Sequence, residues 1–342
     1  MAAITASIQT LCRAGDNIVS VNQLYGGTYN LFAHTLPQQG IWVRMASGDD
    51  VEALEAEIDD RTKAIFCESI GNPAGNVIDI PLLSEMAHRH GIPVIVDNTV
   101  PTPYLCRPFD HGADIVVHSL TKYIGGHGTT IGGIIVESGN FPWKDNPRFP
   151  QFNIPDPSYH GVIYADASDV PFILRARVVP LRNMGAALSP FNAFNILQGL
   201  ETLALRMDRH VENAISIATH LQNHDRILWV NYAGLPEDRY HSLAKKICSG
   251  KPSAIISFGI EGGEKSGTKF IDALKMIKRL VNIGDAKTLA CHPASTTHRQ
   301  LRDEELKRAG VTSDLVRISV GIEHVDDIIA DIDQALAAAM SS

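Results

Sequence analysis

The stretch that decides the fold reads Asp114-Ile115-Val116-Val117-His118-Ser119-Leu120-Thr121-Lys122-Tyr123-Ile124-Gly125-Gly126-His127-Gly128. Its first part, residues 114–117, is almost entirely apolar, which is typical of a strand covered on both faces of a sheet. Its second part places Ser119, Thr121 and Lys122 directly after that strand. An ammonium group next to a buried strand is costly unless it is paired or used covalently. This turn is therefore the first candidate for chemistry.

Apolar runs and helical patterns alternate on the N-terminal side of this stretch. We expect strands at residues 17–21, 41–45, 64–68 and 93–97, and helical segments at residues 2–12, 29–36, 50–58 and 82–90. This alternation indicates βαβ units around a mostly parallel sheet. The sequence therefore predicts an α/β fold with helices on both faces of the sheet.

The pattern changes in the second half of the chain. Residues 140–171 contain many Pro, Asn, Asp and aromatic residues, which predicts a long functional or interface loop. A helical pattern at residues 190–222 precedes short strands at 254–260 and 315–320 and helices at 267–277 and 325–339. A chain longer than roughly 250–300 residues usually divides into domains, because a single hydrophobic core stops growing at about that length. We therefore predict a large domain at residues 1–205 and a smaller C-terminal α/β domain at residues 206–342.

Composition excludes several classes of protein. Thirty Lys and Arg against 38 Asp and Glu give a net charge of −8, which argues against a nucleic-acid partner. The five cysteines are scattered singly, so neither a disulfide framework nor a zinc site is expected, and a cytoplasmic protein is predicted. No stretch reaches the ~20 apolar residues of a membrane span. His88 and His90 are too close in sequence to share one helix face, so they predict no metal site.

Polar side chains follow two neighbouring strands of the predicted sheet. Asp97 ends the strand at residues 93–97, and the Ser119-to-Lys122 turn follows the next one. Ligands of open α/β sheets bind at the carboxyl ends of the strands. A desolvated lysine is suited to Schiff-base chemistry. Alone, Lys122 would be read as a solvated loop lysine and Asp97 as a helix cap.

Together, these residues resemble the lysine signature of the Cys/Met-metabolism family of pyridoxal-phosphate enzymes. The resemblance implies the fold type I (aspartate-aminotransferase-like) architecture and pyridoxal 5′-phosphate as the cofactor. It extends over the whole chain, through motifs in the family's order: Leu24-Tyr25-Gly26-Gly27-Thr28-Tyr29, Glu68-Ser69-Ile70-Gly71-Asn72-Pro73, Val96-Asp97-Asn98-Thr99, Gly284-Asp285-Ala286-Lys287-Thr288-Leu289, His292-Pro293-Ala294-Ser295-Thr296-Thr297-His298 and Leu315-Val316-Arg317-Ile318-Ser319-Val320-Gly321.

The resemblance assigns cofactor roles to residues of the first domain. Lys122 is similar to the lysine that binds the cofactor covalently and then moves substrate protons. Asp97 is similar to the carboxylate that keeps the pyridine nitrogen protonated. Ser119 and Thr121 resemble hydroxyl donors to the phosphate, and Tyr25 resembles the aromatic that stacks on the ring and protonates the leaving group.

Substrate roles follow in the same way. Arg317 lies in an otherwise apolar strand, and a buried guanidinium needs a carboxylate partner; by resemblance, this partner is the substrate α-carboxylate. Asn72 resembles the amide that contacts both the cofactor 3′-oxygen and that carboxylate. Asn282 occupies a position at which relatives also contact the carboxylate.

Within the family, the chain looks nearest to the O-acetylhomoserine sulfhydrylase branch, because of Gly27 and residues 140–171. The resemblance implies γ-replacement on O-acetyl-L-homoserine by sulfide or a thiol, giving homocysteine or methionine and acetate, in sulfur amino-acid biosynthesis. It also implies a homo-oligomer, a dimer or tetramer with shared active sites. Cystathionine γ-synthase or methionine γ-lyase activity remains an alternative.

Relatives carry a further segment before the position of Met1, with a Tyr-x-Arg pair and a Ser-Gly pair that contact the cofactor phosphate. Losing such charge-assisted hydrogen bonds costs roughly 1.5–3 kcal/mol each, so weak cofactor binding is expected. A catalytically silent assembly partner is the alternative from another class. A Rossmann dehydrogenase is rejected, because the glycines at residues 125–128 follow Lys122 and no G-x-G-x-x-G is present.

Overall fold

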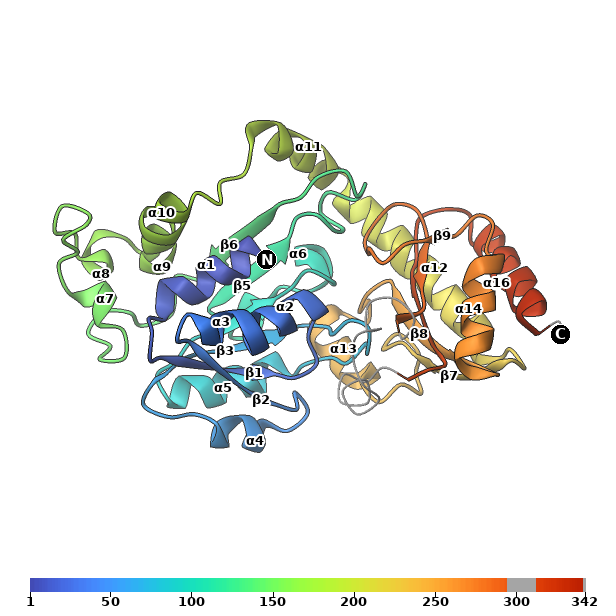
Figure 1. Ribbon diagram of the computed structural model, residues 1–342, viewed down its shortest axis with the longest axis horizontal. Coiled ribbons are helices and arrows are strands. Elements are labelled where there is room, and N and C mark those ends of the chain that lie inside the picture. Colours follow the sequence, from blue (N-terminus) through green and yellow to red (C-terminus); the bar gives the residue numbers. More distant parts are fainter. Residues whose placement is uncertain (294–311, 341–342) are drawn as a thin grey trace.

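The computed structural model describes residues 1–293 and 312–340, which form two β-sheets with their covering helices. The six-stranded sheet and the five-stranded sheet lie in separate parts of the molecule. The chain passes from the first part to the second through α11 (Pro190–Glu201) and α12 (Leu203–Gln222) (Figure 1). In the described ranges, no helix has the length and apolar character needed to cross a membrane.

The first sheet has the order β2-β1-β3-β4-β5-β6. Its first five strands are parallel, as predicted, and β6 pairs antiparallel with β5 at the edge. All residues of β1 and β3 are buried, because helices cover both faces. The strands are β1 (Asn17–Val21), β2 (Trp42–Ala46), β3 (Thr62–Glu68), β4 (Val94–Asp97), β5 (Ile115–Ser119) and β6 (Gly133–Glu137).

Helices follow the strands of this sheet in alternation. Asp50 and Asp79 accept hydrogen bonds from Ala53 and Leu82 and cap two of them, α4 and α5. α1 contacts β5 and β6, α4 contacts β1 and β2, and α5 contacts β4. The helical segments are α1 (Ala2–Leu11), α2 (Gly26–Asn30), η1 (Leu31–Thr35), α3 (Leu36–Gln38), α4 (Val51–Ala56), α5 (Ile80–Arg89), α6 (Thr102–Leu105) and η2 (Pro108–His111).

The second sheet has the order β7-β8-β11-β10-β9 and is mostly antiparallel. α14 and α16 pack against each other, α14 also contacts β8 and β11, and α12 contacts α16. Its elements are β7 (Ile227–Asn231), α13 (His241–Cys248), β8 (Ile255–Ile260), α14 (Gly263–Ala273), β9 (Lys278–Arg279), β10 (Leu289–Cys291), β11 (Leu315–Ser319) and α16 (Val325–Met340). The motif at residues 292–298 lies mostly outside the described residues.

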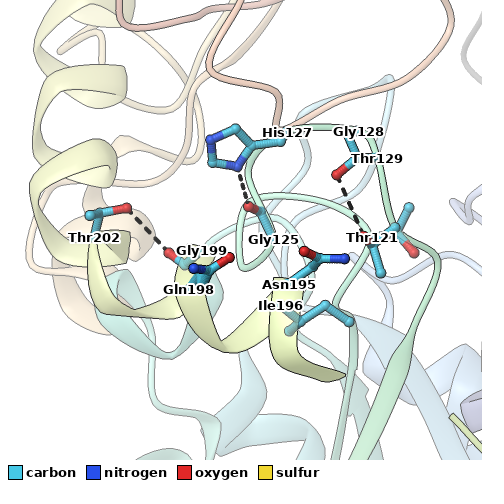
Figure 2. Close-up of a pocket in the computed structure, with 11 residues that line it drawn as sticks. Thr121, Gly125, His127, Gly128, Thr129, Asn195, Ile196, Gln198, Gly199 and Thr202 are labelled. Atoms are coloured by element: carbon cyan, nitrogen blue, oxygen red, sulfur yellow. Dashed lines mark hydrogen bonds between the residues drawn. The ribbon is translucent and has the colours of Figure 1, made fainter. Parts of the chain in front are cut away.

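The helical pattern at residues 190–222 forms two helices, not one. The break is at Thr202, whose hydroxyl donates to the Gly199 carbonyl (3.3 Å; Figure 2). The buried Arg206 guanidinium donates to the same carbonyl (2.6 Å) and to the carbonyls of Tyr123 (2.6 Å) and Ile124 (3.2 Å). Arg206 thus ties the helix break to the turn after Lys122. The predicted domain boundary at residue 205 lies within α12, which contacts α6, next to the first sheet, and β7 and β8 of the second sheet.

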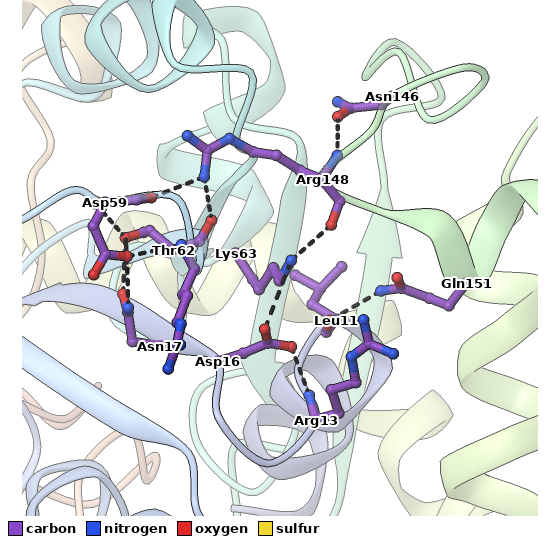
Figure 3. Close-up of polar contacts among 11 residues, drawn as sticks. Leu11, Arg13, Asp16, Asn17, Asp59, Thr62, Lys63, Asn146, Arg148 and Gln151 are labelled. Carbon is purple, nitrogen blue, oxygen red and sulfur yellow. Dashed lines mark hydrogen bonds and ion pairs between the residues drawn. The ribbon is translucent and has the colours of Figure 1, made fainter.

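Residues 140–171 differ from the predicted loop, because they carry short helices and a buried aromatic cluster. Trp143 packs on Phe141, Phe149, Phe152 and Phe172, and its indole donates to Glu137 (2.7 Å). Polar contacts join the segment to α1 and β3 (Figure 3). The Pro and Asn residues therefore mark turns inside a packed element. The helices within this range are α7 (Pro150–Asn153) and α8 (Tyr164–Ala167). They are followed by α9 (Pro171–Ala176), η3 (Arg177–Leu181) and α10 (Arg182–Met184).

Candidate active site

Lys122 lies in the turn after β5, where a loop of the second sheet reaches it. Its Nζ donates a short hydrogen bond to Asn282 Oδ1. The loop comes this close because Gly284 has φ +72° and packs against the backbone of Lys122 and Tyr123, where a Cβ atom would lie 2.5 Å from the Tyr123 nitrogen. Burial lowers the pKa of Lys122, and the nearby Arg317 cation lowers it further.

Arg317 on β11 connects the two sheets. Its side chain is buried, and Nη1 donates to Oδ1 of Asn72 (3.1 Å), which lies in a turn after β3 of the first sheet. Nη2 donates to the carbonyls of Val281 (2.5 Å) and Asn282 (3.2 Å). Nε is buried without a hydrogen-bond partner among the described residues. The predicted carboxylate partner is therefore not a side chain of the described part of the chain. A buried guanidinium with an N–H group that has no partner there can bind an anion.

Asp97, at the end of β4, is held by the residues that follow it. Its Oδ1 accepts hydrogen bonds from the Thr99 backbone (3.0 Å) and hydroxyl (2.5 Å). The Thr99 hydroxyl in turn accepts from the Ser119 backbone (2.8 Å). The two strand ends thus meet, as predicted from the parallel sheet. Burial raises the pKa of Asp97, and the bonds from Thr99 act in the opposite direction.

Tyr25 and Glu68 form the next part of the site, and sequence reasoning gave Glu68 no role. The Tyr25 ring is half exposed, and its backbone N–H donates to Glu68 Oε1 (2.6 Å). Glu68 is paired in register with Asp97 on the adjacent strand. Burial and the Asp97 charge raise the pKa of Glu68. Its place at the end of an apolar strand is the signal that could have found it.

Thr121 lies apart from these contacts. Its hydroxyl donates to the Gly132 carbonyl (3.3 Å) and accepts from the Gly132 backbone N–H (3.1 Å). It also lines a pocket of about 460 Å³ between the glycine-rich turn and α11 (Figure 2). The other predicted site residues do not line this pocket. The hydroxyl roles expected of Ser119 and Thr121 stay predictions.

The predicted absence of a histidine metal site was based on His88 and His90. In the structure, His88 pairs with Asp114 (2.9 Å) and His90 with Glu55 (2.7 Å), so each has a carboxylate partner of its own. Within the described ranges, no group of three or more His, Cys, Asp or Glu side chains could hold a metal ion.

Residues 1–337 match the Cys/Met metabolism PLP-dependent enzyme family. The chain belongs to this family. It is 53% identical over 340 residues to the homocysteine synthase of Schizosaccharomyces pombe, covering 98% of this chain and 79% of that relative. It is 49% identical to the O-acetyl-L-homoserine sulfhydrylase of Leptospira meyeri, covering 96% of this chain and 77% of the relative.

Solved structures of family members agree. A putative O-acetylhomoserine (thiol)-lyase from Campylobacter jejuni, crystallised with a pyridoxyl-lysine phosphate, superposes with a TM-score of 0.94 at 43% identity, covering 98% of this chain and 80% of that one. The O-acetylhomoserine sulfhydrylase of Wolinella succinogenes gives a TM-score of 0.85 at 38% identity, covering 98% and 89%. The fold is thus the fold type I architecture that the sequence predicted.

The residues of the site fit pyridoxal 5′-phosphate. Lys122 supplies a half-buried amine of lowered pKa, which is suited to bonding a carbonyl carbon. Asp97 supplies a carboxylate whose hydrogen bonds, among the described residues, reach Oδ1 only, so Oδ2 can face a ring N–H. The Nε of Arg317, which has no hydrogen-bond partner in the described part of the chain, suits the carboxylate of an amino-acid substrate.

Proposed function

We propose that this chain catalyses γ-replacement on O-acetyl-L-homoserine: the bond from Cγ to the acetate oxygen breaks, sulfide forms a new Cγ–S bond, and homocysteine and acetate leave. The observation that carries this proposal is the hydrogen-bond chain from Lys122 through Asn282 and Arg317 to Asn72. It places an amine of lowered pKa beside a buried guanidinium with an unused donor. The names and identities of the relatives support the same reaction.

The residues have separate tasks in this reaction. The cofactor, when bound, acts as the electron sink for charge that develops on substrate carbon. Lys122 holds it covalently and then takes and returns protons at Nζ. Asp97 keeps the ring nitrogen protonated. Ser119 would donate to the phosphate, and so would Thr121 once its hydroxyl turns away from the Gly132 carbonyl. Arg317 holds the α-carboxylate.

Three further side chains complete the proposed site. Asn72 orients Arg317 by accepting from Nη1 and also contacts the cofactor 3′-oxygen. Asn282 holds the Lys122 amine through its side chain and Arg317 through its backbone carbonyl. Tyr25 covers the cofactor ring and protonates the departing group. A Cβ atom at Gly27 would lie 2.6 Å from the Tyr25 ring, so glycine is what lets the ring keep this position.

The reaction is tested by varying the nucleophile. Purified chain with O-acetyl-L-homoserine and sulfide should release homocysteine and acetate in equal amounts. Omitting sulfide should nearly stop acetate release, whereas a γ-lyase would form 2-oxobutyrate and ammonia. Replacing sulfide by L-cysteine separates the second alternative, because a cystathionine γ-synthase would form cystathionine. No product with any nucleophile at saturating cofactor would support the silent assembly partner instead.

The proposal includes a homo-oligomer. On α11, Phe191 is 72%, Phe194 56% and Leu197 58% exposed, and their spacing puts them along one side of the helix. α11 lies at the margin of the molecule and borders the pocket at the glycine-rich turn (Figures 1 and 2). Large exposed apolar faces typically mark protein interfaces. A second copy of this chain is the proposed partner.

A cytoplasmic location is also proposed, because all five cysteines are free and buried.

Phe191→Glu combined with Phe194→Glu should dissociate the oligomer, because two charges would be buried in an apolar interface. Light scattering should show a larger particle for the wild type and a particle near 37.2 kDa for the variant. Leu228→Glu is the matched control, because Leu228 is 62% exposed on β7, away from α11. A monomeric wild type, or a variant of unchanged mass, would contradict this interface.

A further inference from the structure

Glu68 is a buried carboxyl group to which the proposed catalytic steps assign no task. It is 5% exposed and lies at the carboxyl end of β3, beside the carboxyl ends of β4 and β5, where Asp97 and Ser119 lie. Burying a carboxyl group beside a second one is costly. The N-terminal ammonium group lowers the pKa of Asp97, whereas Glu68 has only backbone N–H groups to offset this cost among the described residues. The arrangement therefore needs a reason in the site itself.

The contacts of Glu68 supply that reason. Oε1 accepts from the Tyr25 backbone N–H (2.6 Å), at the residue that precedes α2. The Asn72 backbone N–H also acts on this carboxyl group and lowers its pKa, against the effect of burial. The Asn72 side chain then accepts from Arg317 on the other sheet. One side chain therefore joins the loop of the aromatic residue to the loop of the amide that orients Arg317.

We propose that Glu68 is a positioning residue whose carboxyl oxygens fix the backbones of Tyr25 and Asn72, so that the ring over the cofactor and the guanidinium at the substrate carboxylate keep their places. This inference rests on the proposed site. The carboxyl group is assigned the role of a hydrogen-bond acceptor, because its oxygen faces the Tyr25 backbone N–H. Burial and the adjacent Asp97 raise its pKa, and the backbone donors act in the opposite direction.

Three variants separate an acceptor from a charge. Glu68→Gln keeps an oxygen at the same reach without ionising, Glu68→Asp keeps a carboxyl group but withdraws it by one methylene, and Glu68→Ala removes the acceptor. We will compare dissociation constants for pyridoxal 5′-phosphate, measured by absorbance titration of the apoprotein. We expect the value for Glu68→Gln to stay within about three-fold of the wild-type value. It should rise at least about ten-fold for Asp and Ala, because a buried N–H loses its partner. The KM for O-acetyl-L-homoserine should follow the same order, through Asn72 and Arg317.

Glu137 is the matched control. It is also a buried glutamate of the first sheet and accepts the backbone N–H of Ile173 (2.9 Å), but it pairs with Ile115, at the opposite end of β5 from Ser119. Glu137→Ala should lower the thermal unfolding midpoint and leave the cofactor dissociation constant of the folded protein unchanged. Glu68→Ala should change both.

The outcomes are distinct. Unchanged cofactor binding and KM in Glu68→Ala and Glu68→Asp would overturn the proposal. It would also be overturned if Glu68→Gln bound the cofactor more weakly than Glu68→Asp, because that order would mean that a charge is required at this position. If Glu68→Ala does not fold, comparing the cofactor dissociation constants of Glu68→Gln and Glu68→Asp still tests the proposal. A wild type that binds no cofactor at Lys122 would instead refute the proposed function, so the two failures are distinguishable.

Discussion

Lys122→Ala is expected to abolish covalent attachment of the cofactor and to lower turnover by at least about 10²–10⁴-fold, the range that general acid–base catalysis supplies. The side chain lies where two sheets meet, and Asn282 holds its amine. Lys63, Lys246, Lys251 and Lys287 donate hydrogen bonds to residues outside the proposed site. Borohydride reduction of the cofactor-treated protein, followed by peptide mapping, should place the wild-type adduct on Lys122 alone.

Lys287→Ala is the control for this experiment. Lys287 follows the loop that carries Asn282, but its side chain is 62% exposed and pairs with Asp285. The control should keep the adduct on Lys122 and near-normal turnover. An adduct on another lysine of the wild type, or none at saturating cofactor, would remove the assignment.

The parts of the fold that the sequence predicted are those with a purely local signal. β1 matches the expected residues 17–21, because an unbroken apolar run bounded by polar turns is typical of a strand covered on both faces. β6 was not expected, because four of its five residues are exposed or half-buried and it pairs antiparallel at the edge. The break at Thr202 was not predicted either. It is held by Arg206, which bonds to the carbonyls of Tyr123 and Ile124, 83 and 82 residues away in sequence.

The site shows the same division. Placing Asp97 and the Lys122 turn together needed only parallel strands and their carboxyl ends. Arg317, Asn72 and Asn282 came from the family resemblance, because no spacing rule brings residues from two sheets together. Glu68 had the form of an ordinary strand end, and its proposed role depends on its register with Asp97 and its contact with the Tyr25 backbone.

Arg317→Ala is expected to raise the KM for O-acetyl-L-homoserine about ten- to hundred-fold with cofactor absorbance retained. A hydrogen bond to a charged group contributes roughly 1.5–3 kcal/mol, and each 1.36 kcal/mol corresponds to ten-fold. Arg317→Lys should restore little of this, because an ammonium group cannot replace a planar guanidinium that bonds Asn72 and two carbonyls at once. Arg279→Ala is the control, since Arg279 is exposed on β9 and pairs with Asp272. An unchanged KM in Arg317→Ala would move the carboxylate site elsewhere.

The same substitution has a second consequence, at Lys122. The Arg317 cation disfavours the ammonium form of Lys122 and so adds to the effect of burial, which lowers the pKa of that amine. Removing the cation should therefore raise the pKa of Lys122, so that the neutral amine becomes populated only at higher pH. Bonding to a carbonyl carbon requires the neutral amine. The rate of cofactor attachment, followed by absorbance across pH, should thus reach half its maximum at higher pH in Arg317→Ala than in the wild type. A shift to lower pH would mean that Arg317 acts on Lys122 through the position of Asn282 rather than through its charge.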